Sequence, residues 1–104
     1  MNRQELVAVL KETIQRVVPS AVPILYGSEA RGEARGDSDI DLLILVDKDS
    51  LSPQEEDAIV EPLYDLEMQT GIIISPVVMT RKAWEAIKRK TVFYHNVMKD
   101  GVLL

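Results

Sequence analysis

The sequence predicts an α/β protein with a small, mixed β-sheet and helices packed on it. One observation is the order of the segments, α-β-α-β-α-β-α, in which helical and strand-like patterns alternate and are joined by long connections. A second is the composition, because a chain of 104 residues with 46% hydrophobic and 28% charged residues is typical of a globular protein with one modest core. We expect a single domain over residues 1–104.

The first helix and the first strand have clear boundaries. Asn2 followed by Glu5 forms the pattern of a capping box, and apolar residues then recur at helical spacing until Pro19. Residues 22–26, VPILY, form a short run of β-forming residues and predict a buried strand. Residues 29–34 are good helix formers and predict one or two further helical turns.

Two later apolar runs predict further strands. Residues 40–46, IDLLILV, are broken only by Asp41 and predict a central strand that is covered on both faces. Residues 72–79, IIISPVVM, predict a third strand, and Pro76 favours an edge position or a bulge because it removes one ladder donor. The segment 102–104 could add to a sheet edge.

Three helices are expected in the second half of the chain. Ser52 and the proline after it supply an N-cap and a first helical residue. Pro62 predicts either a kink or two helical pieces, and Gly71 predicts the end of this helix. Residues 80–90 predict a further helix, and residues 91–101 a short one.

Composition excludes several classes of function. The chain has 12 basic and 17 acidic residues, a net charge of -5, which argues against strong non-specific binding of nucleic acid although local basic patches are possible. It has no cysteine and one histidine, so any metal must bind oxygen ligands. Residues 1–18 have neither the pattern of a signal peptide nor that of a membrane span, so we expect a cytoplasmic protein without membrane contact.

Asp39 and Asp41 stand two residues apart at the start of the second predicted strand. Their side chains therefore project from the same face. Two such carboxylates repel each other unless a cation neutralises them, and Mg²⁺ commonly binds one or two carboxylates together with substrate phosphates. The alternative is that both acids lie at a solvated strand end and bind nothing.

Gly27 and Ser28 follow the first predicted strand directly, with ten residues between Ser28 and Asp39. A glycine lets backbone amides approach a ligand closely, and the start of a short helix attracts phosphate. Gly-Ser alone is an ordinary turn, but beside a carboxylate pair it predicts a phosphate cradle next to a metal site. Arg31 and Arg35 lie four apart on the predicted helix, so they could share a face and contact triphosphate oxygens, or they could pair with neighbouring acids.

The stretch GSEARGEARGDSDIDLLI resembles the signature of the DNA polymerase β-like nucleotidyltransferase superfamily, and within it the minimal, MNT-type nucleotidyltransferases. The resemblance implies the nucleotidyltransferase fold. It implies that Gly27 and Ser28 hold the triphosphate of ATP or another NTP, and that Asp39 and Asp41 bind Mg²⁺. The implied reaction is transfer of a nucleoside monophosphate to a hydroxyl.

The chain departs from the family pattern in the third predicted strand. Active members usually carry a third carboxylate there, whereas residues 72–79 contain no acid and only one polar side chain, Ser75. Glu67 or Asp65 could substitute from the preceding helix. A neutral serine cannot replace the lost charge, so the alternative function is a catalytically weak or inactive, antitoxin-like module that neutralises a partner by contact.

The same resemblance implies a partner protein. MNT-type proteins are often found with a small helical HEPN-type protein, so we expect a protein acceptor beside the nucleotide. The aromatic residues Tyr26, Trp84, Phe93 and Tyr94 are candidates for the interface, with core packing as the alternative for Trp84 and Phe93.

Overall fold

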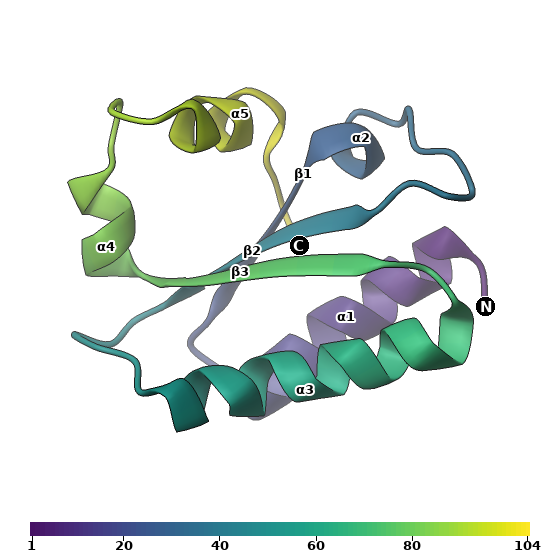
Figure 1. Ribbon diagram of the computed structural model, residues 1–104, viewed down its shortest axis with the longest axis horizontal. Coiled ribbons are helices and arrows are strands. Elements are labelled where there is room, and N and C mark those ends of the chain that lie inside the picture. Colours follow the sequence, from purple (N-terminus) through teal and green to yellow (C-terminus); the bar gives the residue numbers. More distant parts are fainter.

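The computed structural model describes all residues, 1–104, and contains five helices and four strands. In chain order they are α1 (Arg3–Val17), β1 (Val22–Tyr26), α2 (Gly27–Ala30), β2 (Ile40–Val46), α3 (Pro53–Thr70), β3 (Ile74–Thr80), α4 (Arg81–Ala86), α5 (Val92–Asp100) and β4 (Val102–Leu103). The strands form one sheet in the order β3-β2-β1-β4. Helices α1 and α3 cover one face, α4 and α5 lie over the other, and α2 follows the end of β1 (Figure 1).

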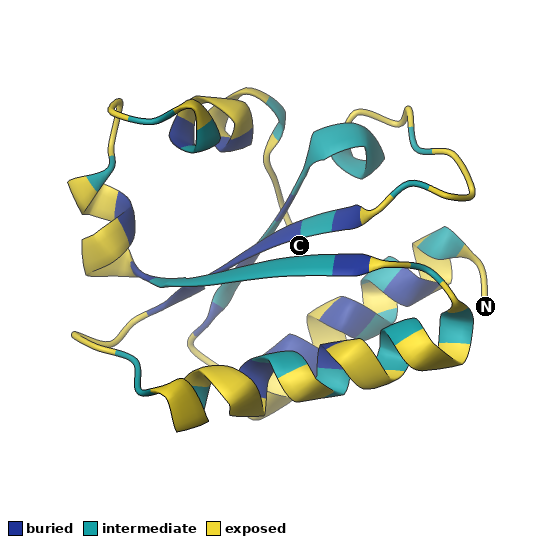
Figure 2. Ribbon diagram, in the orientation of Figure 1, coloured by how far each residue is buried: buried dark blue, intermediate teal, exposed yellow.

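The sheet is mixed, as predicted, because β2 and β3 are parallel while β1 is antiparallel to both β2 and β4. Strand β3 is at one edge of the sheet. A proline is tolerated there, because an edge strand has a partner on one side only and Pro76 needs no N–H toward the open side. Strand β4 is at the other edge, and the N–H of Leu104 donates to the carbonyl of Pro23 at 3.0 Å. Both edge predictions are confirmed. Figure 2 shows the central strand β2 buried and β3 half-buried.

The caps of the two long helices also follow the sequence. Helix α1 begins with the predicted capping box of Asn2, and α3 begins with one formed by Ser52. Gly71 ends α3 in the left-handed conformation, at φ 73°. Helix α3 runs through Pro62 without interruption, so the prediction of two helical pieces is wrong. The ring removes a single backbone donor, and the buried side chains on either side of it, Ile59 and Leu63, hold both halves of the helix against the core.

Helix α4 is shorter than the predicted 80–90 segment. It ends at Ala86 and is followed by a turn in which Arg89 has φ 62°. A residue in the left-handed region cannot continue a right-handed helix, so the chain turns here and enters α5. Thr91 caps α5 by accepting the backbone N–H of Tyr94 at 3.0 Å.

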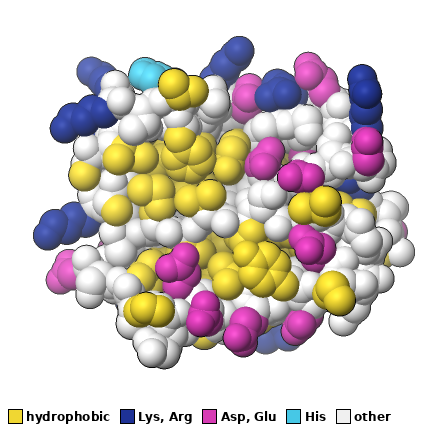
Figure 3. All heavy atoms as spheres, viewed as in Figure 1, with side chains coloured by type: hydrophobic (Ala, Val, Ile, Leu, Met, Phe, Trp, Pro, Cys, Tyr) yellow, Lys and Arg dark blue, Asp and Glu magenta, His cyan; other side chains and the backbone are white.

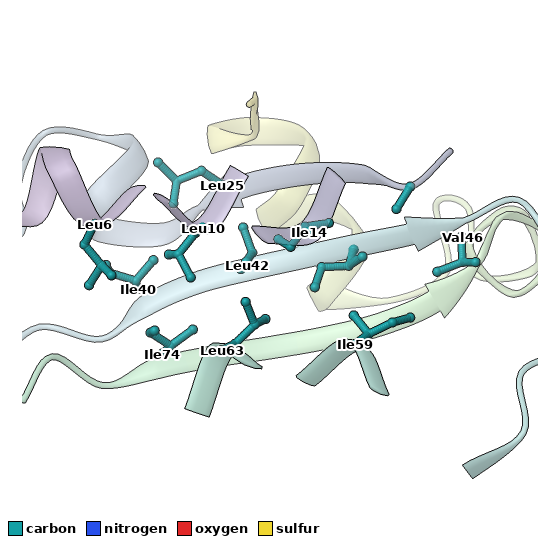
Figure 4. Close-up of a cluster of buried hydrophobic side chains, with 12 residues drawn as sticks. Leu6, Leu10, Ile14, Leu25, Ile40, Leu42, Val46, Ile59, Leu63 and Ile74 are labelled. Atoms are coloured by element: carbon teal, nitrogen blue, oxygen red, sulfur yellow. The ribbon is translucent and has the colours of Figure 1, made fainter. Parts of the chain in front are cut away.

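Two hydrophobic clusters occupy the two faces of the sheet, since side chains alternate along each strand. The larger lies under α1 and α3 (Figure 4) and contains Leu6, Leu10, Ile14, Ala21, Leu25, Ile40, Leu42, Ile44, Val46, Ile59, Leu63 and Ile74. The smaller lies under α4 and α5 and contains Leu43, Leu45, Trp84, Tyr94 and Val97. Asp41 is in phase with Leu43, so its carboxylate is on the α4 and α5 face.

None of the five helices combines the length and the hydropathy that a membrane-spanning helix needs. The cytoplasmic location stays a prediction.

Candidate active site

The site lies where the C-terminal end of β1 meets the N-terminal ends of β2 and β3. Strand pairing places Tyr26 opposite Asp41 and Asp41 opposite Ser75, in one row across the sheet. Asp39 immediately precedes β2, and the Ser75 hydroxyl donates to its Oδ2 at 3.2 Å. The two acids therefore lie together at the sheet end, with a neutral hydroxyl beside them.

Gly27 brings together the two halves of the motif, which are the Gly27-Ser28 turn and the pair Asp39 and Asp41. Its backbone has φ 74°, and a Cβ atom placed on it would collide with Oδ2 of Asp41 and lie 3.3 Å from its Cγ. By contrast, a Cβ placed on Gly32, at φ 72°, would meet nothing within 4 Å. Gly27 is thus needed both for its backbone conformation and for the space that the Asp41 carboxylate occupies.

Asp41 has no ion-pair partner, and its surroundings disfavour its charged form. Partial burial, followed by the negative charge of Asp39, raises the pKa of the Asp41 carboxyl, while the positive charge of Arg31 lowers it. Burial, followed by the charge of Asp41, raises the pKa of the Tyr26 hydroxyl. The site therefore holds a negative potential that a cation would relieve.

A polar cleft of about 420 Å³ opens beside Asp41. Its lining combines the motif with the C-terminal half of α5, and consists of Tyr26, Gly27, Ser28, Arg31, Asp41, Asn96, Lys99 and Asp100. Sequence reasoning missed the three residues from α5, because a polar helix face usually faces only solvent. Their spacing is the signal that was available, since positions three and four apart share one face of a helix.

Helix α2 differs from the predicted 29–34 segment. It covers Gly27–Ala30 and ends in a Schellman motif, in which the N–H of Glu33 donates to the carbonyl of Ser28 and that of Gly32 to the carbonyl of Glu29. Gly32 occupies the left-handed position that this motif requires. A glycine after a short helical run is the signal that predicts this ending.

The two arginines consequently do not share a helix face, and that prediction is wrong. Arg31 lines the cleft, where its guanidinium donates to Asp100 at 2.9 Å and to Glu33 at 3.2 Å. Arg35 lies in the loop beyond α2 and does not line the cleft. Its backbone N–H donates to the Ser38 hydroxyl at 2.8 Å.

No acid completes a metal site of three protein ligands. Ser75 occupies the strand position next to Asp41, and Glu67 accepts the backbone N–H of Ile74 at 2.8 Å, which commits its carboxylate to the start of β3. The structure contains no group of three His, Cys, Asp or Glu side chains that could hold a metal ion. The pair Asp39 and Asp41 still fits a hard cation that takes its other ligands from substrate phosphates and water.

The candidate interface aromatics belong largely to the second core cluster. Trp84 and Tyr94 are buried, with ring centroids 4.8 Å apart. Phe93 is half-buried and meets both Trp84 and Tyr26 edge-on. Core packing therefore accounts for Trp84 and Tyr94, and Tyr26 is the one aromatic residue of this group that lines the cleft.

Comparison with known proteins identifies the family of the domain and relatives of its fold. Residues 7–98 match the family model "Nucleotidyltransferase domain". A Methanocaldococcus jannaschii protein named "Putative protein adenylyltransferase" is 31% identical over 100 residues, which cover 96% of this chain and 88% of that protein. The fold is similar to that of a "putative minimal nucleotidyltransferase", with a TM-score of 0.66 and 22% identity over 100% of this chain and 97% of the other. It is also similar to a chain in a crystal structure of a toxin-antitoxin with AMP-PNP, with a TM-score of 0.63 and 18% identity over 98% of this chain and 72% of the other.

Proposed function

Because the chain belongs to the nucleotidyltransferase domain family, we propose that it transfers the adenylyl group of ATP, or the equivalent group of another NTP, to a hydroxyl of a partner protein. The superfamily resemblance of the Gly-Ser and Asp-x-Asp stretch is confirmed, and with it the enzyme class, a nucleotidyltransferase. Two parts of the proposal, the adenylyl group and the protein acceptor, are suggested by the name of the Methanocaldococcus jannaschii relative.

One observation carries the proposal: the backbone of Gly27 packs directly against the carboxylate of Asp41. A phosphate bound by the Gly27 and Ser28 backbone would therefore lie beside the acid that is to share a metal with it. Arg31 and Lys99 are the cations of the same cleft, and both can contact phosphate oxygens. The family motif and α5 thus supply a single anion site.

Asp39 and Asp41 are the residues that would hold Mg²⁺. When bound, the ion would polarise the α-phosphate and stabilise the charge that develops on the departing pyrophosphate. With two protein carboxylates, the site depends on the nucleotide for further ligands. We therefore expect Mg²⁺ and ATP to bind together, each weakly without the other.

The transfer step exchanges one bond at the α-phosphorus for another. The acceptor hydroxyl oxygen forms a bond to the α-phosphorus, and the bond from this atom to the oxygen that bridges to the β-phosphate breaks. The electron pair of the broken bond leaves with pyrophosphate. The hydroxyl proton passes to water in the cleft, because β3 presents the neutral Ser75 instead of a basic carboxylate.

A basic segment next to the second core cluster is the surface that we assign to the acceptor. Residues 81–90, RKAWEAIKRK, contain five basic side chains and one acidic one in a chain of net charge -5. All five basic residues are exposed, and none is in an ion pair. In Figure 3, Lys and Arg side chains project at the left, where Figure 1 places α4 and the connection to α5. An acidic surface of a small helical HEPN-type partner would fit this segment.

A second function is favoured by Ser75. The Ser75 hydroxyl contacts Asp39 at the position where active family members usually have a third carboxylate. Without that acid, the chain could bind nucleotide without turnover and neutralise its partner by contact. The two functions differ in whether labelled phosphate moves.

The test is to incubate the protein and the product of the neighbouring gene with MgCl₂ and with ATP labelled at either the α- or the γ-phosphate. The proposed function predicts that the partner acquires α-label and no γ-label. Asp41→Asn should abolish the transfer, whereas Asp57→Asn, a change of an exposed acid on α3 and on the opposite face of the sheet, should retain it. Partner binding that survives Asp41→Asn while no label moves with any NTP would support the contact function instead.

The basic segment is tested separately by the double variant Lys88→Glu, Lys90→Glu. It should weaken partner binding at least about tenfold and make it less sensitive to salt, and leave ATP binding unchanged. Lys11→Glu, a charge reversal on the exposed face of α1, is the matched control. Equal effects of the two changes would contradict the assignment.

A further inference from the structure

One arginine from α1 contacts three separate points around the active site. Nε of Arg3 donates to Oε1 of Glu29 at 2.7 Å. Nη2 donates to the carbonyl of Ser38 at 2.7 Å, and Nη1 to that of Gly36 at 3.4 Å. The side chains of Arg3 and Glu29 are each 17% exposed, so this ion pair is well shielded from solvent.

These contacts reach both halves of the motif. Glu29 follows Ser28 in α2, so its position is tied to that of the phosphate cradle. Gly36 and Ser38 belong to the loop that leads into Asp39. This loop has no regular secondary structure. Apart from the contacts of Arg3, residues 35–38 are held by one turn, in which the N–H of Arg35 donates to the Ser38 hydroxyl and the N–H of Ser38 donates to the carbonyl of Arg35.

We propose that Arg3 is a positioning residue for nucleotidyl transfer, which holds the cradle and the Asp39 loop at a fixed separation from each other. The inference rests on the proposed function. Arg3 lies on α1 and does not line the cleft, so it acts through α2 and the loop, not through the substrate.

The chemistry of arginine suits this role. Its planar guanidinium carries five donors, and here three nitrogen atoms serve one carboxylate and two carbonyls at once. The ion pair also compensates the negative charge of Glu29, which would otherwise oppose a triphosphate bound at the neighbouring Ser28. A lysine has a single ammonium group on a flexible stem, so it could keep the contact with Glu29 and lose the fork to the loop.

The test compares Arg3→Gln with Arg3→Lys and with Arg16→Gln, a change of an exposed arginine on the same helix that has no ion pair. Amide hydrogen exchange of the free proteins reports the loop, and titration with Mg²⁺ and ATP reports the site. Both are measured well below the unfolding temperature of every variant.

For Arg3→Gln, we expect exchange of the Ser38 amide, the one N–H of residues 36–39 that has a hydrogen-bond partner, to rise at least about tenfold, as for loss of a charge-assisted hydrogen bond, while amides of β2 stay protected. The dissociation constant for ATP in the presence of Mg²⁺ should rise about ten- to a hundredfold. Arg3→Lys should fall between wild type and Arg3→Gln, and Arg16→Gln should match wild type. Because global unfolding would also expose β2, this graded result together with protected β2 amides would separate the role of Arg3 from a general loss of stability.

Unchanged exchange of the Ser38 amide in Arg3→Gln would overturn the proposal. So would raised exchange with unchanged nucleotide affinity, because Arg3 would then be structural only. Failure of the wild-type protein to bind any nucleotide is a different result and overturns the proposed function, on which this role of Arg3 depends.

Discussion

Replacement of Gly27 by alanine tests the contact between the two halves of the motif. The change adds a Cβ atom at φ 74°, where it collides with the Asp41 carboxylate. The conformation alone costs an L-residue about 1–2 kcal/mol. Overpacking against Asp41 adds about 1–3 kcal/mol, because Cγ and Cβ of Asp41 also lie within 3.4 Å and rotation of the carboxylate group alone cannot relieve the overlap.

Gly32→Ala is the matched control, since Gly32 has nearly the same φ, 72°, and open space around it. It should lose only the conformational part, about 1–2 kcal/mol, partly offset by the smaller entropy of the unfolded chain. We therefore expect Gly27→Ala to be less stable than Gly32→Ala by about 1–3 kcal/mol, or roughly 4–20 °C in unfolding temperature for a domain of about 100 residues. Gly27→Ala should also lose Mg²⁺-dependent ATP binding.

The assay is urea unfolding of both variants in the wild-type and Asp41→Ala backgrounds. Without the Asp41 carboxylate, Gly27→Ala should cost no more than Gly32→Ala, so Gly27 and Asp41 should show a coupling energy of about 1–3 kcal/mol. Additive effects at the two positions, or equal costs for the two glycine variants in the wild-type background, would refute the reasoning.

Three further outcomes follow from the same site. Ser75→Asp should lower the unfolding temperature without Mg²⁺, because it adds a third acid beside Asp39. It should also raise the rate of label transfer at least about tenfold, because it supplies the missing base. An unchanged rate would contradict this role. Asp100→Asn should release Arg31 from its ion pair with Asp100 and so lower the dissociation constant for ATP about two- to fivefold in calorimetric titration. Weaker binding would show that Asp100 itself holds the nucleotide. The raised pKa of Asp41 means that the folded state binds its proton more tightly than the unfolded state, so its contribution to stability is present at low pH and is lost as the pH rises through the folded-state pKa. Asp41→Asn should therefore be more stable than wild type at neutral pH, with a difference that shrinks in acid, and a constant difference across pH would contradict the cause given for the shift.

Local signals in the sequence predict most of the elements. Capping boxes at Asn2 and Ser52 locate the starts of both long helices, and Pro76 locates the edge strand. These signals depend on backbone donors within a few residues of each other, so they can be recognised without the tertiary fold. Pro62 is the exception, because it does not divide α3 into two pieces: burial of Ile59 and Leu63 outweighs one missing hydrogen bond, and a kink at Pro62 stays a prediction.

The site is predictable only in part. The spacing of Gly27 and Asp41 brings the two half-motifs to adjacent strand ends, but their direct contact depends on the antiparallel pairing of β1 with β2. The contributions of α5 and Arg3 arise from packing between segments far apart in sequence. The spacing of Asn96, Lys99 and Asp100 indicates a shared helix face but not what that face meets, and no local pattern indicates Arg3. The ion pair of Arg31 with Asp100 joins residues 69 positions apart for the same reason.

The most direct test of the site is paramagnetic broadening of amide signals by Mn²⁺, used in place of Mg²⁺, with and without ATP. Two carboxylates without a third protein ligand should bind Mn²⁺ weakly alone and firmly in the presence of ATP. We predict that ATP strengthens the broadening and centres it on Gly27, Ser28 and Asp41. Broadening that does not respond to ATP, or that centres on another acidic segment such as residues 55–57, would contradict a metal site shared between these carboxylates and the nucleotide.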